Sequence, residues 1–147
     1  MPAAWAYFDT SALVKRYISE SGSLQVMALF RRHDFLSSAI NNPELLSAFS
    51  RRRRSGELSE AHFMTLLGRV QNDRPRWELV DVSSAVLEGA EQLVQGEIAV
   101  RTLDAIHVAS LITFKNAAGA DIPFVTADAR QRDAARRVGL DVVWVGR

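Results

Sequence analysis

The stretch Trp5-Ala6-Tyr7-Phe8-Asp9, followed at once by Thr10-Ser11-Ala12-Leu13, decides the fold that this sequence predicts. Residues 5–8 are an apolar, aromatic run of the kind that fills a buried strand. Asp9 ends this run, and Thr10 and Ser11 are suited to cap a helix expected over residues 12–18. A strand that carries an acid at its tip, just before a helix, places that acid at the ligand-binding edge of an α/β sheet. The alternative is that Asp9 serves only as a helix N-cap.

Short apolar runs alternate with helical stretches along the rest of the chain. Further strands are expected at residues 35–38, 77–82, 123–126 and 142–145, and helices at residues 12–18, 23–32, 42–54, 59–72, 83–95, 103–118 and 129–138. Asn42, Ser59 and Thr102 are the expected caps of three of these helices, with Pro43 at the first helical position after Asn42. This alternation predicts an α/β sandwich around a parallel sheet.

The size and composition indicate one globular domain over residues 1–147, with 48% hydrophobic residues to fill its core. The two helices expected between the second and third strands form an insertion or arm of that domain. The absence of cysteine excludes disulfides, thiolate metal sites and a cysteine nucleophile. Met1-Pro2-Ala3-Ala4 lacks the features of a signal peptide, and no apolar run approaches the ~20 residues of a membrane span. We therefore expect a cytoplasmic protein that is not in a membrane.

The positive charge is unevenly distributed, although the net charge is only +1. Residues 31–76 contain nine arginines and five acids, and only two of the 18 basic residues in the chain are lysines. Arginine binds phosphate through two hydrogen bonds and stacks on bases, so this bias suits nucleic acid, although codon bias would also produce it.

A run of four arginines stands out within this segment, at Arg51, Arg52, Arg53 and Arg54. The run lies about 10–15 Å beyond Glu44 on one helix, at 1.5 Å per residue. That distance fits contacts with phosphates that flank a scissile one. At most two of the four side chains face one RNA, and the alternative is a solvated helix end whose charge suits the helix dipole.

Four acids occupy the starts of helices: Asp9, Glu44, Asp104 and Asp128. Asp9 and Asp128 also follow strands directly. Each one has a purely structural explanation, because the helix dipole stabilises an acid in the first turn by about 0.3–1 kcal/mol. Asp128 with Gln131 is, on that view, a capping box.

Asp104 is the acid for which a purely structural explanation is weakest. Its helix begins Leu103-Asp104-Ala105-Ile106-His107-Val108-Ala109 and is apolar on nearly all sides. A carboxylate at the mouth of a buried helix needs a cation or hydrogen-bond donors. His107 shares its face, and we interpret it as a semi-buried hydrogen-bonding residue rather than a metal ligand.

Several carboxylates that converge on one cleft need a cation, and oxygen-only ligands suit Mg²⁺ or Mn²⁺. Such an ion lowers the pKa of a bound water and clamps a phosphodiester. The scattered positions of His33, His62 and His107 give weak grounds for a ribonuclease that uses two histidines.

The acids and their neighbours together resemble the PIN domain nucleases. The residues that carry the resemblance are Phe8-Asp9-Thr10-Ser11-Ala12-Leu13-Val14-Lys15, Glu44-Leu45, residues 103–109 and Thr126-Ala127-Asp128. The resemblance spans essentially the whole chain, and the single-domain layout is most similar to the VapC-type toxins of bacterial toxin–antitoxin pairs. One departure is Asn41-Asn42-Pro43 before Glu44, where a lead-in rich in serine and threonine is expected.

The resemblance implies a three-layer α/β sandwich with a five-stranded parallel sheet in the order 3-2-1-4-5. It also implies that the acids are the catalytic and metal-binding set, with Asp9 and Asp104 as direct ligands and Glu44 and Asp128 able to act through water. Thr126 would hold an acid or the metal's water by its hydroxyl, Thr10 and Ser11 would cap and orient, and His107 would support the site.

The implied activity is cleavage of RNA by a metal-activated water, with Mg²⁺ as cofactor, Mn²⁺ as a substitute and a 5′-phosphate on the product. The implied partners are an antitoxin whose tail covers the acidic cleft and a second copy of the chain in a homodimer. The alternative function is a non-catalytic PIN-like module that binds RNA or a partner. A phosphatase of the haloacid dehalogenase type would need an acid two residues after Asp9, where Ser11 stands, and the acidic pair and late lysine of a receiver domain are not visible.

Overall fold

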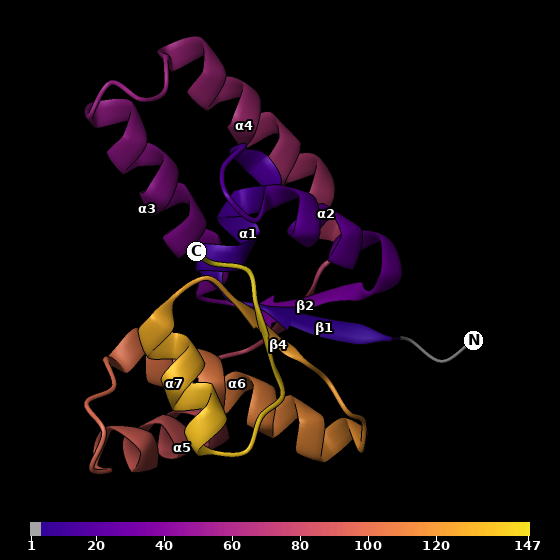
Figure 1. Cartoon of the computed structure of the whole chain (residues 1–147), viewed down its shortest axis with the longest axis vertical. Helices are drawn as coiled ribbons and strands as arrows, with labels where there is room; N and C mark the ends of the chain where they lie inside the picture. Colours follow the sequence, from indigo (N-terminus) through magenta and orange to yellow (C-terminus); the bar gives the residue numbers. More distant parts are fainter. Residues whose placement is uncertain (1–3) are drawn as a thin grey trace.

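A five-stranded parallel sheet separates two layers of helices in the computed structural model, which describes residues 4–147 (Figure 1). The strand order β3-β2-β1-β4-β5 confirms the predicted order. The strands are β1 (Trp5–Phe8), β2 (Asp34–Ser38), β3 (Glu78–Val80), β4 (Phe124–Thr126) and β5 (Val142–Trp144).

The chain reverses its direction of winding between β1 and β4, which are neighbours in the sheet. Ala6 pairs with Phe35 of β2 on one side of β1, and Phe8 pairs with Val125 of β4 on the other. The carboxyl ends of β1 and β4 therefore lie side by side at the point where open α/β sheets bind ligands.

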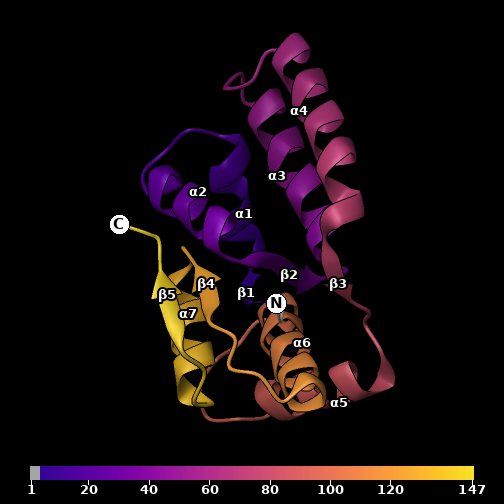
Figure 2. The same ribbon diagram turned by 90° about the vertical axis from the view of Figure 1, so that its right-hand side faces the viewer.

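The helices divide into two groups by their position in the sequence (Figure 2). The first group lies on one side of the sheet and comprises α1 (Thr10–Tyr17), α2 (Ser23–Arg32), α3 (Asn41–Arg54) and α4 (Glu60–Asp73), which a short 3-10 helix, η1 (Arg74–Arg76), follows. The second group lies on the other side and comprises α5 (Ser84–Val94), α6 (Thr102–Ala118) and α7 (Ala129–Arg137). The paired helices α3 and α4 project away from the sheet, as expected of an arm.

Side chains of β1 alternate between the two layers, because successive residues of a strand point to opposite faces. Ala6 and Phe8 pack into the core beneath α1–α4, and Phe8 stacks on Phe30 and Phe35. Tyr7 points the other way, into the core beneath α6, where it stacks on Phe124. The residue immediately before the strand tip thus reaches the helix that carries Asp104.

Three of the expected helix caps are wrong. Asp9 is the N-cap of α1 and accepts a hydrogen bond from the backbone of Ala12, so Thr10 and Ser11 are the first helical residues instead. Their hydroxyls hydrogen-bond to acids of the site described below, which draws them away from capping.

The helix α3 begins one residue earlier than expected, at Asn41, so Asn42 does not cap it and Pro43 is its third residue. A proline is tolerated there because the amides of the first turn have no partner within the helix. Thr102 is the first residue of α6 and not its cap, while Ser59 caps α4 as predicted.

The expectation that no signal peptide is present concerns residues 1–3, which lie outside the described residues, together with Ala4. Within residues 4–147, none of the helices combines the length and the apolar character that crossing a membrane requires.

Candidate active site

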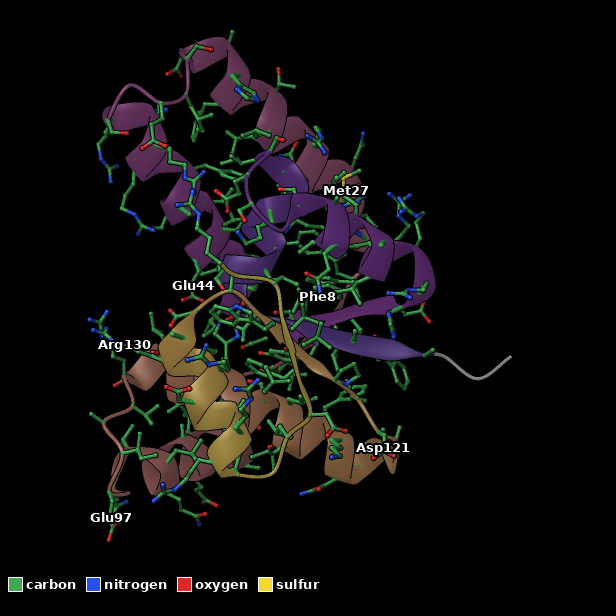
Figure 3. The ribbon with its side chains drawn as sticks, viewed as in Figure 1. Phe8, Met27, Glu44, Glu97, Asp121 and Arg130 are labelled. Atoms are coloured by element: carbon green, nitrogen blue, oxygen red, sulfur yellow. The ribbon has the colours of Figure 1, made fainter. Side chains whose placement is uncertain are left out.

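The four acids predicted as site residues all lie at the carboxyl edge of the sheet. Asp9 and Asp128 follow β1 and β4 and cap the helices α1 and α7. Glu44 and Asp104 lie in the first turns of α3 and α6, which come from opposite layers. Figure 3 shows Glu44 at the end of α3 that faces the sheet.

Asp9 is almost fully enclosed, at 3% exposure, and is held by three donors. Its Oδ1 accepts hydrogen bonds from the Ser11 hydroxyl at 2.7 Å and the Ala12 amide at 3.0 Å. Its Oδ2 accepts one from the Thr126 hydroxyl at 2.5 Å. Burial raises the pKa of Asp9, and His107 together with these donors offsets only part of the rise.

Ser11 and Thr126 also join the two strand tips to each other. The Ser11 hydroxyl accepts a hydrogen bond from the Ala127 amide at 2.9 Å, and the Thr126 hydroxyl accepts one from the Asp128 amide at 3.0 Å. Each of the two hydroxyls therefore donates to Asp9 and accepts from the backbone that leads to Asp128. The positions of these two acids are coupled through this network.

Glu44 is held by donors from both helical layers. Its Oε1 accepts a hydrogen bond from the Thr10 hydroxyl at 2.7 Å and lies 2.6 Å from Nε2 of His107. Burial alone would raise the pKa of Glu44, but the hydrogen bonds from His107 and Thr10 outweigh it and lower the pKa. Glu44 is therefore ionised at neutral pH.

Asp104 is half-buried and makes no hydrogen bond or ion pair with any residue from Ala4 onward. Burial raises the pKa of Asp104, the negative charge of Asp128 raises it next, and Glu44 adds to the effect against His107 and Arg101. The charges of Asp128 and Glu44, which come from two other elements, thus lie near enough to Asp104 to raise its pKa.

His107 contacts a different acid from the one that its position on the helix suggested. It shares a helical face with Asp104, yet its buried ring lies between Glu44 and Tyr7, with Nδ1 at 2.7 Å from the Tyr7 hydroxyl. Tyr7 was missed as a site residue, although its place two residues before Asp9 in β1 points it toward α6. Asn41 was missed as well, and its Oδ1 lies 3.0 Å from the Thr10 hydroxyl.

A cleft of about 760 Å³ lies between α1 and α3, and Glu44 is the member of the four acids that lines it. Lys15, Arg51 and Arg52 also line it. Arg52 forms an ion pair with Glu20 at 3.2 Å, whereas Arg51 is exposed and has no ion-pair partner within the described part of the chain.

Arg53 and Arg54 do not line this cleft. The guanidinium of Arg53 lies over the ring of Phe63 and 3.5 Å from Glu60, so it packs against α4. The four-arginine run therefore divides into two members that face the cleft and two that do not.

The site fits a divalent cation in its chemistry. No group of three or more acidic or histidine side chains among residues 4–147 is arranged closely enough to enclose a metal ion. Nevertheless, Asp104, Oε2 of Glu44 and Oδ2 of Asp128 have no hydrogen-bond partner in that range, and Oδ2 of Asp9, which accepts one hydrogen bond, keeps a lone pair. Hard carboxylate oxygens that repel one another are the ligands that Mg²⁺ or Mn²⁺ prefers.

Comparisons with known proteins agree with this architecture. Residues 6–137 match the sequence model of the PIN domain family. The chain is similar to a solved toxin–antitoxin complex from Klebsiella pneumoniae, with 17% identity over 86% of this chain and 88% of that one and a TM-score of 0.58. It is also similar to VapBC2 from Rickettsia felis bound to a DNA fragment from their promoter, with 14% identity over 94% and 96% and a TM-score of 0.63. The comparison with curated proteins gave no match.

Proposed function

The chain belongs to the PIN domain family, and from this premise we propose that it is a Mg²⁺-dependent endoribonuclease that serves as the toxin of a VapC-type toxin–antitoxin pair. PIN domains are generally nucleases that use divalent metal ions. The observation that carries the proposal is the placement of all four acids at one edge of the sheet, where the charges of Asp128 and Glu44 raise the pKa of Asp104.

The four acids have distinct roles in this proposal. Asp9 and Asp104 would bind the cation directly, and Glu44 and Asp128 would bind it directly or through water. A divalent ion held there would lower the pKa of a water, so that this water could lose a proton and attack phosphorus at neutral pH, and it would neutralise charge on the phosphodiester. Thr126 and Ser11 hold Asp9 in place.

The cleft beside Glu44 is the proposed path of the RNA strand. Arg51 lies two turns along α3 from Glu44 and faces the same cleft, so its guanidinium suits a phosphate next to the scissile one. Arg52 shares the cleft but is engaged by Glu20. Arg51 is therefore the arginine that we expect to contribute most to RNA binding.

The proposed protein partners are a cognate antitoxin and a second copy of the chain. The two similar structures contain toxin–antitoxin pairs, which supports an antitoxin partner here. A cationic segment of that antitoxin would complement the carboxylates and block the cleft. The homodimer rests on the resemblance to VapC-type toxins.

A non-catalytic module that binds RNA or a partner is the second candidate. The spacing of the acids favours this candidate, because no three acidic or histidine side chains among the described residues are close enough to enclose an ion. The two candidates differ in whether a phosphodiester is broken.

The test is cleavage of end-labelled RNA by the purified protein with Mg²⁺, with Mn²⁺ or with excess EDTA. We expect Mg²⁺-dependent products that carry 5′-phosphates, and loss of cleavage in Asp104→Asn. Asp121→Asn is the matched control, because Asp121 is exposed and lies away from Glu44, in the segment between α6 and β4 (Figure 3). Cleavage that persists in EDTA would overturn the proposal, and RNA binding without cleavage in any metal would establish the non-catalytic candidate.

A further inference from the structure

Two successive hydrogen bonds connect Tyr7 of β1 to Glu44 of α3 through the ring of His107. The Tyr7 hydroxyl lies 2.7 Å from Nδ1 of His107, and Nε2 of the same ring lies 2.6 Å from Oε1 of Glu44. Tyr7 is fully enclosed and His107 is 2% exposed, so water does not compete for these bonds. The three residues come from β1, α6 and α3, and they cross the sheet edge from one helical layer to the other.

The direction of the protons along these two hydrogen bonds follows from the chemistry of the groups. A phenol carries its proton at neutral pH, and a carboxylate only accepts hydrogen bonds. Nδ1 lies 2.7 Å from the Tyr7 hydroxyl and can accept its hydrogen, while the nearby hydroxyls of Ser37 and Ser110 donate to backbone carbonyls. When the phenol donates to Nδ1, the ring hydrogen lies on Nε2 and points at Glu44.

The two oxygens of Glu44 then have different surroundings. Oε1 receives hydrogen bonds from His107 and Thr10, while Oε2 has no hydrogen-bond partner within residues 4–147. The Glu44 side chain is 24% exposed and lines the cleft. One oxygen is thus fixed toward the protein interior, which leaves the other for the cleft.

We propose that Tyr7 and His107 are positioning residues that fix the imidazole as its Nε2–H tautomer and thereby aim the second oxygen of Glu44 into the cation site. This inference rests on the proposed function only in treating Glu44 as part of a cation site. Outer groups that orient a ligand in this way commonly affect metal affinity by 10–100-fold. His107 therefore acts through Glu44 and not on the RNA.

The first test is the ¹⁵N spectrum of the histidine side chains in the full-length protein without metal. Comparison with the spectrum of His107→Gln identifies which of the signals of the three histidines belong to His107. We expect the Nε2–H pattern for His107 in the wild type and a loss of that single tautomer in Tyr7→Phe, with a shift of the Glu44 side-chain carboxyl ¹³C signal. Tyr17→Phe is the matched control, because Tyr17 is also buried and its hydroxyl bonds Asp73 at 2.6 Å, away from the acids.

The second test is the affinity for Mn²⁺ alone, followed by its paramagnetic resonance signal. We expect a roughly tenfold weaker affinity in Tyr7→Phe and an unchanged affinity in Tyr17→Phe. His107→Gln keeps an N–H near the place of Nε2, so its affinity should exceed that of His107→Leu, which has a similar size and no donor. This rescue would not occur if His107 only filled space.

The outcomes separate the inference from the proposed function. Wild-type protein that binds no Mn²⁺ would count against the proposed function and against the aiming of Glu44 at a cation. The tautomer and the Glu44 signal would still be measured in that case. Mn²⁺ binding in the wild type with the same affinity and the same tautomer in Tyr7→Phe would overturn the inference and leave the nuclease proposal intact.

Discussion

The hydroxyl of Thr126 donates a 2.5 Å hydrogen bond to the carboxylate of Asp9, although the two lie 117 positions apart in the chain. The bond crosses from the end of β4 to the end of β1, the two strands between which the winding reverses. Because Asp9 is buried, the hydroxyl also offsets part of the free-energy cost of enclosing its charge. The position of the acid thus depends on the pairing of two strands far apart in sequence.

Replacement of Thr126 by valine should weaken both the fold and the activity. Valine keeps the shape of threonine but removes the donor, so the buried Asp9 carboxylate loses a partner at a cost of about 1–3 kcal/mol in the free energy of unfolding. Denaturant unfolding measures this cost, and cleavage should fall at least tenfold. Thr65→Val is the control, since Thr65 is exposed on α4 and bonds only its own helix. Equal losses of stability in the two variants would contradict the role of Thr126.

The charge of Asp104 should make the protein less stable as the pH rises. Burial and the charges of Asp128 and Glu44 raise the pKa of Asp104, so the folded state holds the Asp104 proton more tightly than the unfolded state. The stabilisation from this proton is complete below the ordinary pKa of 3.8 and is lost as the pH rises through the raised pKa.

Asp104→Asn removes this pH dependence, so its free energy of unfolding should increase relative to that of the wild type between pH 4 and pH 7. Urea unfolding across this range in EDTA provides the measurement. Asp121→Asn should show no comparable trend. If the free energy of unfolding of the wild type increased with pH relative to that of Asp104→Asn, the raised pKa of Asp104 would be refuted.

Arg51 and Arg54 should differ in their contributions to RNA binding, although both are exposed arginines of α3. Arg51 lines the cleft with Glu44 and Arg54 does not. Arg51→Ala should weaken binding and reduce the slope of log affinity against log salt by about one, because one phosphate contact is lost. Arg54→Ala should leave the slope nearly unchanged, and identical slopes for the two variants would exclude the cleft as the path of the RNA.

RNA with a single 2′-deoxy nucleotide at the cut site should remain cleavable. In the proposed reaction water attacks phosphorus, so the neighbouring ribose hydroxyl is not the nucleophile. The product should carry a 5′-phosphate with either substrate. This phosphate is detected when the 5′ end of the product can be labelled only after phosphatase treatment. A deoxy substrate that resists cleavage, together with a 2′,3′-cyclic phosphate from normal RNA, would contradict attack by water.

The sequence was sufficient to predict features that depend on local patterns. The five strands and the helices of the arm are observed where short apolar runs and helix breaks predicted them, whereas the confirmed strand order was predicted from the resemblance to the PIN domains. The acids were found for a related reason, since each lies at the start of a helix. Their position at one edge of the sheet followed from the parallel order of the strands.

The features that were missed depend on contacts between distant residues. Thr10 and Ser11 have the composition of caps, but their hydroxyls bond Glu44 and Asp9 instead. His107 was placed beside Asp104 because the two share a helical face, yet it bonds Glu44, 63 residues away in sequence. Helical spacing specifies which residues share a face and not which element packs against that face.

The central claim is that Asp9, Glu44, Asp104 and Asp128 together hold a divalent ion, and calorimetric titration with Mn²⁺ in the absence of RNA tests it most directly. We predict saturable binding in the wild type and in Asp121→Asn, and a loss of binding in both Asp9→Asn and Asp104→Asn. The same Mn²⁺ affinity in all four proteins would contradict the claim, as would a folded wild-type protein that binds no Mn²⁺.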